Sequence, residues 1–470
     1  MNNKVLNEYR FFDPDKTIRK IAYELYLQVK NLPIISPHGH VDPKVLAENK
    51  PFPDPTELIL IPDHYLLRML YSQGISLESL GIPTIDGGKV EKSNKKIWQL
   101  FADNFYLFRG TPSSVWLQYE FAEVFGIQEQ FNSQNAMVIY NRMKEKLQSK
   151  EYLPRLLFER FNIEVLSTTD GASDSLENHK KIKESGWTGK VIPCFRPDAI
   201  IDITSENWIQ EIDTLSKSSR VDISSYKKYI QAIKYRREFF KSMGAVSTDH
   251  GVASPFTHKL TENEAEEIFQ KALRGIANED DSKMFTANIL IEMAKMSIED
   301  GLVMQIHPGV MRNHNLKLFY KFGRDKGADI PVKTEYTRNL FELLNEFGND
   351  KNLTIIIFTL DETTYSRELA PLAGHYPVLK LGPPWWFNDS IHGMARFREN
   401  VTEIAGIYNT AGFNDDTRAF LSIPARHDLS RRVDSNFLAG MVARHIISMD
   451  EAADLSKALA YDLAKKAYKI

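Results

Sequence analysis

Two histidines separated by a single residue, His38 and His40, follow directly after a short apolar segment. On an extended backbone, residues two apart point to the same side, so both imidazoles can reach one metal ion. A pair of hydrogen-bonded turn histidines would have the same spacing. The position of the pair directly after a buried strand favours metal binding, and we interpret His38 and His40 as candidate metal ligands.

Polar residues also follow other apolar segments of the chain. They are Thr168-Thr169-Asp170, Arg196-Pro197-Asp198, Asp249-His250, His307-Pro308-Gly309, Trp385-Trp386-Phe387-Asn388-Asp389 and Asp415-Asp416-Thr417-Arg418. Taken singly, each histidine in this set is more often structural than functional. Their joint position after separate strands is hard to explain by packing, and it predicts a site at one rim of the fold.

Two of these groups have both a structural and a functional interpretation. The Trp385-Trp386 pair fits a hydrophobic core and equally fits a sugar, whose C–H faces stack on aromatic rings. Arg196 fits a surface ion pair, but its place after an apolar strand favours recognition of a carboxylate by its fixed donor fork.

Eight apolar segments separated by helical patterns are predicted to be the strands that position these residues. They are Leu32–Pro37, Ile163–Ser167, Lys190–Phe195, Gly244–Thr248, Leu302–Ile306, Leu353–Thr359, Val378–Leu381 and a weaker Ala411–Asn414. Several are continuously apolar, as strands buried on both faces should be. The pattern predicts an α/β fold, a (β/α)8 barrel. A doubly wound sheet is the alternative, but the chain has no Gly-rich phosphate-binding turn.

The helical stretches divide the chain into a barrel and an insertion. Residues 1–42 and 162–470 are predicted to form the barrel, and residues 43–161 a mostly helical insertion over the active site. Helical patterns between strands include Asp174–Glu184, Glu262–Leu273 and Thr334–Glu346. A second helical excursion spans residues 257–300, and Ser448 to Glu451 has the pattern of a capping box that opens a final helix.

Composition restricts the classes of partner. The formal net charge of −3, from 59 basic and 62 acidic residues, gives no general attraction to nucleic acid or to an anionic membrane. Cys194 is the only cysteine, and the first residues do not have the pattern of a signal peptide. We therefore expect a cytoplasmic protein that acts on a small molecule, and we also expect a homo-oligomer.

In this order, the motifs resemble those of the uronate isomerase family, the glucuronate isomerase branch of the amidohydrolase superfamily. The resemblance extends from near residue 30 to Arg426-His427-Asp428 and Arg431-Arg432. It rests on the groups above together with Asp63-His64-Tyr65, Gln305-Ile306-His307 and Arg312-Asn313.

The resemblance implies a distorted barrel with one divalent metal ion, commonly zinc, and the interconversion of an aldose uronic acid with its ketose. It also implies roles for individual residues. The implied metal ligands are His38, His40 and Asp416; Tyr65 and Asp416 match residues for proton transfer; and the substrate pocket is matched by His64, Arg196, Arg418, Trp385 and Trp386. Beyond the resemblance, we expect Asp416, Tyr65 and Arg418 to share proton transfer and enediolate stabilisation, and His307 to contact substrate.

The chain departs from the usual family pattern at three places, which are Gly171-Ala172 after Asp170, Gln118 where a histidine is common, and Asp415 in place of a threonine. None removes an implied ligand. The main alternative is a mononuclear hydrolase of the same superfamily. Neither a Lys after the fourth strand nor a His after the sixth is present, which disfavours a binuclear hydrolase. A catalytically inactive sugar-acid binding protein would not need Tyr65 or the Asp416-Thr417-Arg418 motif.

Overall fold

Seven parallel strands form one curled sheet at the centre of the molecule. The computed structural model describes residues 5–470. The sheet order is β1-β2-β3-β4-β5-β8-β9, so the strands lie in the sheet in the order in which they occur in the chain. These strands are β1 (Ile34–Ser36), β2 (Ile163–Gly171), β3 (Lys190–Arg196), β4 (Ser247–His250), β5 (Val303–Ile306), β8 (Ile355–Ile357) and β9 (Leu379–Leu381). Parallel pairing throughout, with helices between the strands, confirms the predicted barrel class.

The predicted eighth strand, Ala411–Asn414, is wrong. At one end this segment has an isolated parallel bridge from Thr410 to Leu381, and at the other end Thr417 O accepts a hydrogen bond of 2.9 Å from His40 N–H. The barrel therefore closes through single backbone contacts rather than through a ladder. The reason is local, because Gly412 (φ 75°) and Asp416 (φ 38°) interrupt the extended backbone that a strand requires.

The other predicted strands are confirmed, with shifted ends. β4 begins at Ser247 rather than Gly244, because Gly244 has φ 100° and cannot continue a strand. A two-stranded antiparallel hairpin that was not predicted, β6 (Val310–Met311) and β7 (Ile330–Pro331), lies between β5 and β8 and contains α14 (Leu316–Phe322).

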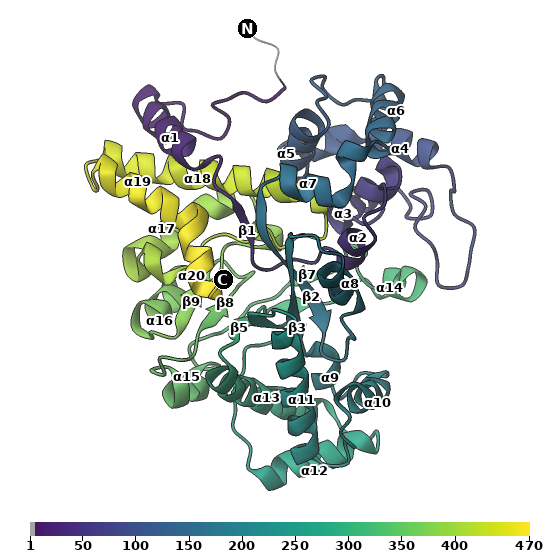
Figure 1. Cartoon of the computed structure of the whole chain (residues 1–470), viewed down its shortest axis with the longest axis vertical. Helices are drawn as coiled ribbons and strands as arrows, with labels where there is room; N and C mark the ends of the chain where they lie inside the picture. Colours follow the sequence, from purple (N-terminus) through teal and green to yellow (C-terminus); the bar gives the residue numbers. More distant parts are fainter. Residues whose placement is uncertain (1–4) are drawn as a thin grey trace.

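Helices between the strands cover the outside of the sheet, as Figure 1 shows. They are α8 (Glu177–Glu184), α9 (Asp198–Ile201), α10 (Trp208–Ser219), α11 (Tyr226–Ser242), α12 (Glu262–Leu273), α13 (Glu279–Asp300), α15 (Phe341–Phe347), α16 (Ala370–His375) and α17 (Ile391–Ala405). The large core lies between these helices and the sheet. The predicted helix Glu262–Leu273 has the same bounds as α12, and α12 and α13 form the predicted helical excursion.

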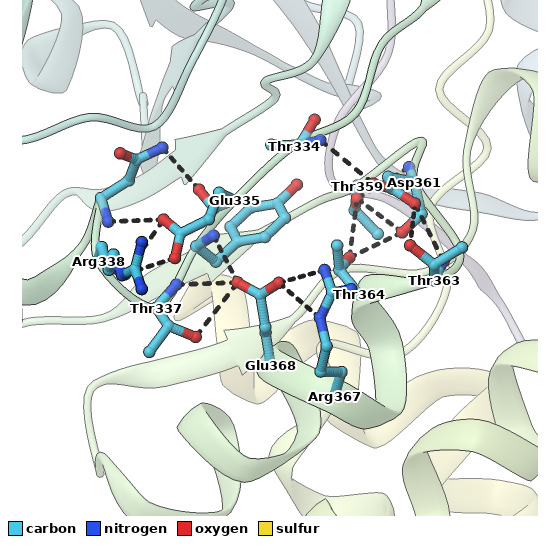
Figure 2. A network of polar contacts seen from close by, with 12 residues as sticks. Thr334, Glu335, Thr337, Arg338, Thr359, Asp361, Thr363, Thr364, Arg367 and Glu368 are labelled. Atoms are coloured by element: carbon cyan, nitrogen blue, oxygen red, sulfur yellow. Dashed lines mark hydrogen bonds and ion pairs between the residues drawn. The ribbon is translucent and has the colours of Figure 1, made fainter.

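The predicted helix Thr334–Glu346 begins only at Phe341, because a polar network holds the preceding segment in a non-helical conformation (Figure 2). The Glu368 carboxylate accepts hydrogen bonds from the backbone N–H groups of Tyr336 (2.7 Å) and Thr337 (3.0 Å). Asp361 accepts one from Thr334 N–H (3.2 Å). Asp361, the acidic residue that follows β8, thus fixes the loop that precedes α15.

The insertion contains six α-helices, which lie together at the upper right of Figure 1. They are α2 (Pro43–Glu48), α3 (His64–Ser72), α4 (Asn94–Asp103), α5 (Pro112–Tyr119), α6 (Ala136–Leu147) and α7 (Pro154–Arg160). Their apolar side chains share one hydrophobic cluster with Ile34 of β1 and with Ile163 and Leu166 of β2. The insertion is therefore packed directly on the first two strands.

The two ends of the chain pack against each other. Helix α1 (Lys16–Val29) contacts α18 (Ile423–Ala443) and α19 (Met449–Lys457) in one apolar cluster. The predicted capping box of α19 is present, and the final helix continues through a π-helical turn, η9 (Ala458–Asp462), into α20 (Leu463–Tyr468). Over residues 5–470 no helix has the length and apolar character needed to cross a membrane.

Candidate active site

A cluster of histidines and one carboxylate lies at the carboxyl end of the barrel strands. Asp416 Oδ1 lies 3.4 Å from His38 Nε2 and 3.1 Å from His40 Nε2. His307 joins them, since one donor atom each of His38, His307 and Asp416 lie within 4.8 Å of one another. The structure therefore brings the three predicted ligands together and adds a fourth side chain, His307, which the sequence had placed only in the substrate pocket.

The donor set fits a metal ion. Two ligand atoms bound to one tetrahedral zinc ion at about 2.1 Å would lie about 3.4 Å apart, close to the spacing observed between the imidazoles and Asp416. His307 Nε2 is buried and has no hydrogen-bond partner among the described residues. Its other nitrogen, Nδ1, lies 2.6 Å from Asp249 Oδ1, and a carboxylate in this position commonly orients a metal-binding histidine.

Asp249 also joins the cluster to Arg196. Its second oxygen lies 3.1 Å from Arg196 Nη1, and Arg196 Nε donates to Asp198 Oδ2 at 2.7 Å. Burial alone would raise the pKa of Asp249, but Arg196, His307 and His38 outweigh burial and hold the pKa well below its ordinary value. Asp249 is thus a buried carboxylate that remains charged between Arg196 and His307.

His250, which the sequence had grouped with the other strand-end histidines, does not face the site. Neighbouring residues on a strand point to opposite faces, so Asp249 faces the barrel interior and His250 does not. The His250 ring Nδ1 lies 2.8 Å from Gln305 O, and burial lowers its pKa.

A cavity of about 1210 Å³ opens above the cluster, between the barrel and the insertion. All of the predicted site residues line it, namely His38, His40, His64, Tyr65, Arg196, His307, Trp385, Trp386, Asp416 and Arg418. Its volume leaves room for a small sugar acid together with solvent. The side chains selected from the sequence thus converge on one space.

The insertion supplies part of the wall of this cavity, including His64 and Tyr65. Asp63 caps α3 by accepting hydrogen bonds from the backbone N–H groups of Tyr65 (2.7 Å) and Leu66 (3.2 Å), which fixes the first turn. Burial raises the pKa of Tyr65 despite the nearby Arg426, and burial lowers the pKa of His64 to about 3, so His64 is neutral at pH 7.

The pair Trp385-Trp386 was predicted to belong either to the hydrophobic core or to a sugar-binding surface, and the two residues differ in this respect. Trp385 is 6% exposed, and its ring lies edge-on to His307 with the centroids 4.8 Å apart. Trp386 has φ 50° and lies beneath the Arg312 guanidinium, 5.0 Å from the ring centroid. Arg418, at the same mouth, lies 3.7 Å from Asp325 and is 39% exposed at its side chain. Trp385 is therefore largely a core residue, and Trp386 belongs to the rim.

Arg426 and Asp389 form a buried ion pair behind Tyr65 that was not assigned a role from the sequence. The Arg426 guanidinium lies 3.6 Å from the centre of the Trp116 ring and 5.8 Å from that of Tyr65. It is the positive group that most strongly lowers the pKa of Tyr65. The motifs containing both residues were noted, but no spacing rule links positions 389 and 426, so only the fold reveals the pair.

Glu120 also lines the cavity and gives a test of its electrostatics. Burial, with a smaller effect from Asp63, raises the pKa of Glu120 from 4.5 to about 8. Between these two values the folded state keeps a proton that the unfolded state has lost, so this group lowers stability as pH rises from 4.5 to 8. The full shift corresponds to roughly 5 kcal/mol.

We therefore expect Glu120→Gln to stabilise the protein at pH 8.5 by up to about this amount, and to change stability little at pH 4.5. Urea unfolding at both pH values measures the difference. Glu123→Gln, an exposed residue of the same helical turn, is the matched control. An equal effect of Glu120→Gln at both pH values would contradict the raised pKa.

The chain is similar to known proteins of one family along almost its entire length. The family model described as glucuronate isomerase matches residues 11–468. A uronate isomerase of Nostoc punctiforme is 55% identical, with 99% of this chain and 98% of that protein covered, and one of Phenylobacterium zucineum is 53% identical over 99% and 97%. The crystal structure of glucuronate isomerase from Caulobacter crescentus superposes with a TM-score of 0.97 at 54% identity, covering 99% of this chain and 97% of that one.

A more distant structure extends the likeness. Uronate isomerase from Thermotoga maritima has a TM-score of 0.92 at 32% identity, covering 98% of this chain and 99% of that one. These proteins belong to the amidohydrolase superfamily, which the resemblance had indicated. With a match along almost its entire length, the chain belongs to the glucuronate isomerase family.

Proposed function

We propose that this chain interconverts hexuronic acids between their aldose and ketose forms, D-glucuronate with D-fructuronate and D-galacturonate with D-tagaturonate. The observation that carries the proposal is the cluster of His38, His40 and Asp416, which lines one cavity together with Tyr65 and Arg418. The names of the most similar relatives support the same reaction. A role in the cytoplasm fits this chemistry and stays a prediction.

His38, His40 and Asp416 would hold one divalent metal ion, for which zinc is our candidate, and His307 is placed to contribute a fourth donor. When bound, the ion would supply a positive charge beside the oxygens of C1 and C2. The protein contributes a largely buried set of donor atoms. Burial alone would raise the pKa of Asp416, but His38 and His40 outweigh burial and hold this pKa well below its ordinary value.

Isomerisation removes a proton from C2 and returns one at C1, while the oxygens on these carbons exchange oxidation level. The C2 proton is weakly acidic, so a base must lie within hydrogen-bond reach and the developing negative charge must be stabilised. We assign proton transfer to Asp416 and Tyr65, which line the same cavity, and charge stabilisation to Arg418. Neutral His64 would accept a hydrogen bond from a sugar hydroxyl or donate one to it.

We propose that Arg196 binds the carboxylate of the sugar acid. Two of its nitrogens already contact Asp198 and Asp249, which fixes the plane of the guanidinium inside the cavity. Arg196→Lys keeps the charge but removes the planar fork, and we expect it to raise KM for a uronate by about 10-fold or more with a smaller change in kcat.

Steady-state kinetics of the variant give both constants. Arg396→Lys changes an Arg that makes a two-pronged contact with Glu362 on the surface, and it serves as the matched control. An unchanged KM in Arg196→Lys would assign carboxylate binding to another residue of the cavity, with Arg312 the first candidate.

A mononuclear hydrolase is the second candidate function, because a metal site with an open position also activates water. Purified protein of known metal content is to be incubated separately with D-glucuronate, D-galacturonate and a sugar lactone. We expect ketose formation from at least one uronate, followed with a coupled reductase, and no lactone hydrolysis above the background rate. Lactone hydrolysis without ketose formation would replace the proposed reaction with the hydrolytic one.

A further inference from the structure

Asp416 lies in a strained turn. Its φ of 38° is in the left-handed region, which is uncommon for residues with a side chain. This conformation places its carboxylate against His38 and His40. The residues on either side of Asp416 must therefore be held firmly enough to maintain the turn.

The downstream side is held by Thr417. Its carbonyl oxygen accepts a hydrogen bond of 2.9 Å from His40 N–H, and its hydroxyl oxygen accepts one of 3.0 Å from Ala419 N–H. Thr169 in turn donates to Gly39 O at 2.8 Å. The turn that carries Asp416 is thus bonded directly to the segment that carries His38 and His40.

The upstream side is held by Asp415, whose Oδ2 lies 3.1 Å from His427 Nε2. Both residues are almost completely buried, with 1% and 3% of their surface exposed. The His427 ring is further fixed edge-on against Phe413, with the ring centroids 4.9 Å apart. Asp415 has no role of its own in the proposed reaction and is not among the residues that line the cavity.

His427 belongs to α18, and the same helix also holds the first strand. Arg431, one turn further along, donates to three carbonyl oxygens just before β1, those of Lys30 (2.9 Å), Leu32 (2.9 Å) and Pro33 (3.0 Å). Residues four apart lie on one face of a helix. One face of α18 therefore fixes both segments from which the clustered ligands His38, His40 and Asp416 project.

Stability does not explain the Asp415–His427 pair. Asp415 Oδ1 is buried without a hydrogen-bond partner anywhere in the part of the chain that the structure describes. Burying a carboxylate that is only partly paired is unfavourable, and a well-packed apolar pair in its place is often neutral or stabilising. What the pair provides is a hydrogen bond of fixed direction from a rigid helix to the residue next to Asp416.

We propose that Asp415 and His427 are positioning residues, which hold the strained turn so that Asp416 meets His38 and His40 at metal-binding distance. The inference rests on the proposed metal site. It predicts that breaking this one contact weakens metal binding without loss of the fold, as the loss of a residue that orients a metal ligand commonly does.

The test is zinc affinity of the metal-free protein, measured by competition with a chromogenic chelator. We expect Asp415→Ala and His427→Leu each to raise the zinc dissociation constant by about 10- to 100-fold. Asp415→Asn keeps an oxygen that can accept from His427, and we expect it to remain within a few-fold of the unchanged protein. With Co²⁺ in place of zinc, the visible spectrum should change in the first two variants and stay unchanged in Asp415→Asn.

Asp434→Asn is the matched control, because Asp434 is buried on the same helix and pairs with Arg398 (2.6 Å) away from the cavity. It should lower thermal stability and leave zinc affinity unchanged. If Asp415→Ala and His427→Leu do not fold, His427→Asn, whose shorter side chain does not reach Asp415, replaces them with the same expected rise.

Unchanged zinc affinity and an unchanged Co²⁺ spectrum in folded variants would overturn the inference. A different result identifies failure of the proposed function itself. If the unchanged protein does not bind zinc, or if Asp416→Asn binds it equally well, the metal site is wrong, whatever the Asp415 and His427 variants do.

Discussion

Asp416→Asn is expected to lower kcat/KM for a uronate by about 1,000-fold or more. The substitution removes a negative charge that lies 3.1 Å from His40 and 3.4 Å from His38, and it removes a carboxylate that can accept a proton. Loss of a group that transfers a proton costs about 10²- to 10⁴-fold in rate. Loss of a charged ligand weakens metal binding in addition.

These two effects can be separated by measuring the zinc content of the Asp416→Asn variant and its rate at saturating zinc. A large rate deficit that persists with zinc bound supports proton transfer by Asp416, and complete rescue by excess zinc restricts Asp416 to ligation. Asp202→Asn is the control, since Asp202 lines the same cavity outside the histidine cluster. A full rate in Asp416→Asn would refute both roles.

Tyr65→Phe is expected to lower kcat by about 10²- to 10⁴-fold with little change in KM. The Tyr65 ring stacks on His64, with centroids 4.4 Å apart, and meets Trp116 edge-on at 5.6 Å. Phenylalanine keeps both ring contacts, so the effect reports on the hydroxyl group. The substitution should leave the cooperative unfolding of the protein nearly unchanged.

Tyr119→Phe is the matched control for the hydroxyl group. Tyr119 lies in the same insertion, burial raises its pKa as it does that of Tyr65, and it is not among the residues that line the cavity. Single-turnover kinetics of both variants compare the chemical step directly. A Tyr65→Phe protein with the rate of the unchanged protein would remove Tyr65 from proton transfer.

The sequence predicted most strands because they are short, apolar and buried on both faces. It failed where backbone dihedral angles decide the outcome. Gly412 and Asp416 adopt positive φ, which turns the apolar segment Ala411–Asn414 into an irregular connection rather than a strand. The small β6–β7 hairpin also escaped prediction, since each of its strands has only two residues and no alternating pattern to detect.

The sequence predicted which residues belong to the candidate site. It did not predict which of their side chains contact one another. Their positions after predicted strands placed His38, His40 and Asp416 at one rim of the fold. The structure brings these three side chains together. The sequence did not distinguish Asp249 from His250, because the face of a strand on which a residue lies depends on the register within the sheet. The position of His307 within the metal cluster likewise depends on a contact between β4 and β5 that sequence spacing does not determine.

The most direct test of the proposed reaction follows the hydrogen on C2 of the substrate. D-glucuronate deuterated at C2 is incubated with the zinc-loaded protein, and deuterium NMR records where the label goes. We expect the label to leave C2 as D-fructuronate forms, at a rate that falls by about 100-fold or more in Tyr65→Phe. Retention of the label at C2, with zinc bound and the protein folded, would contradict isomerisation at this site.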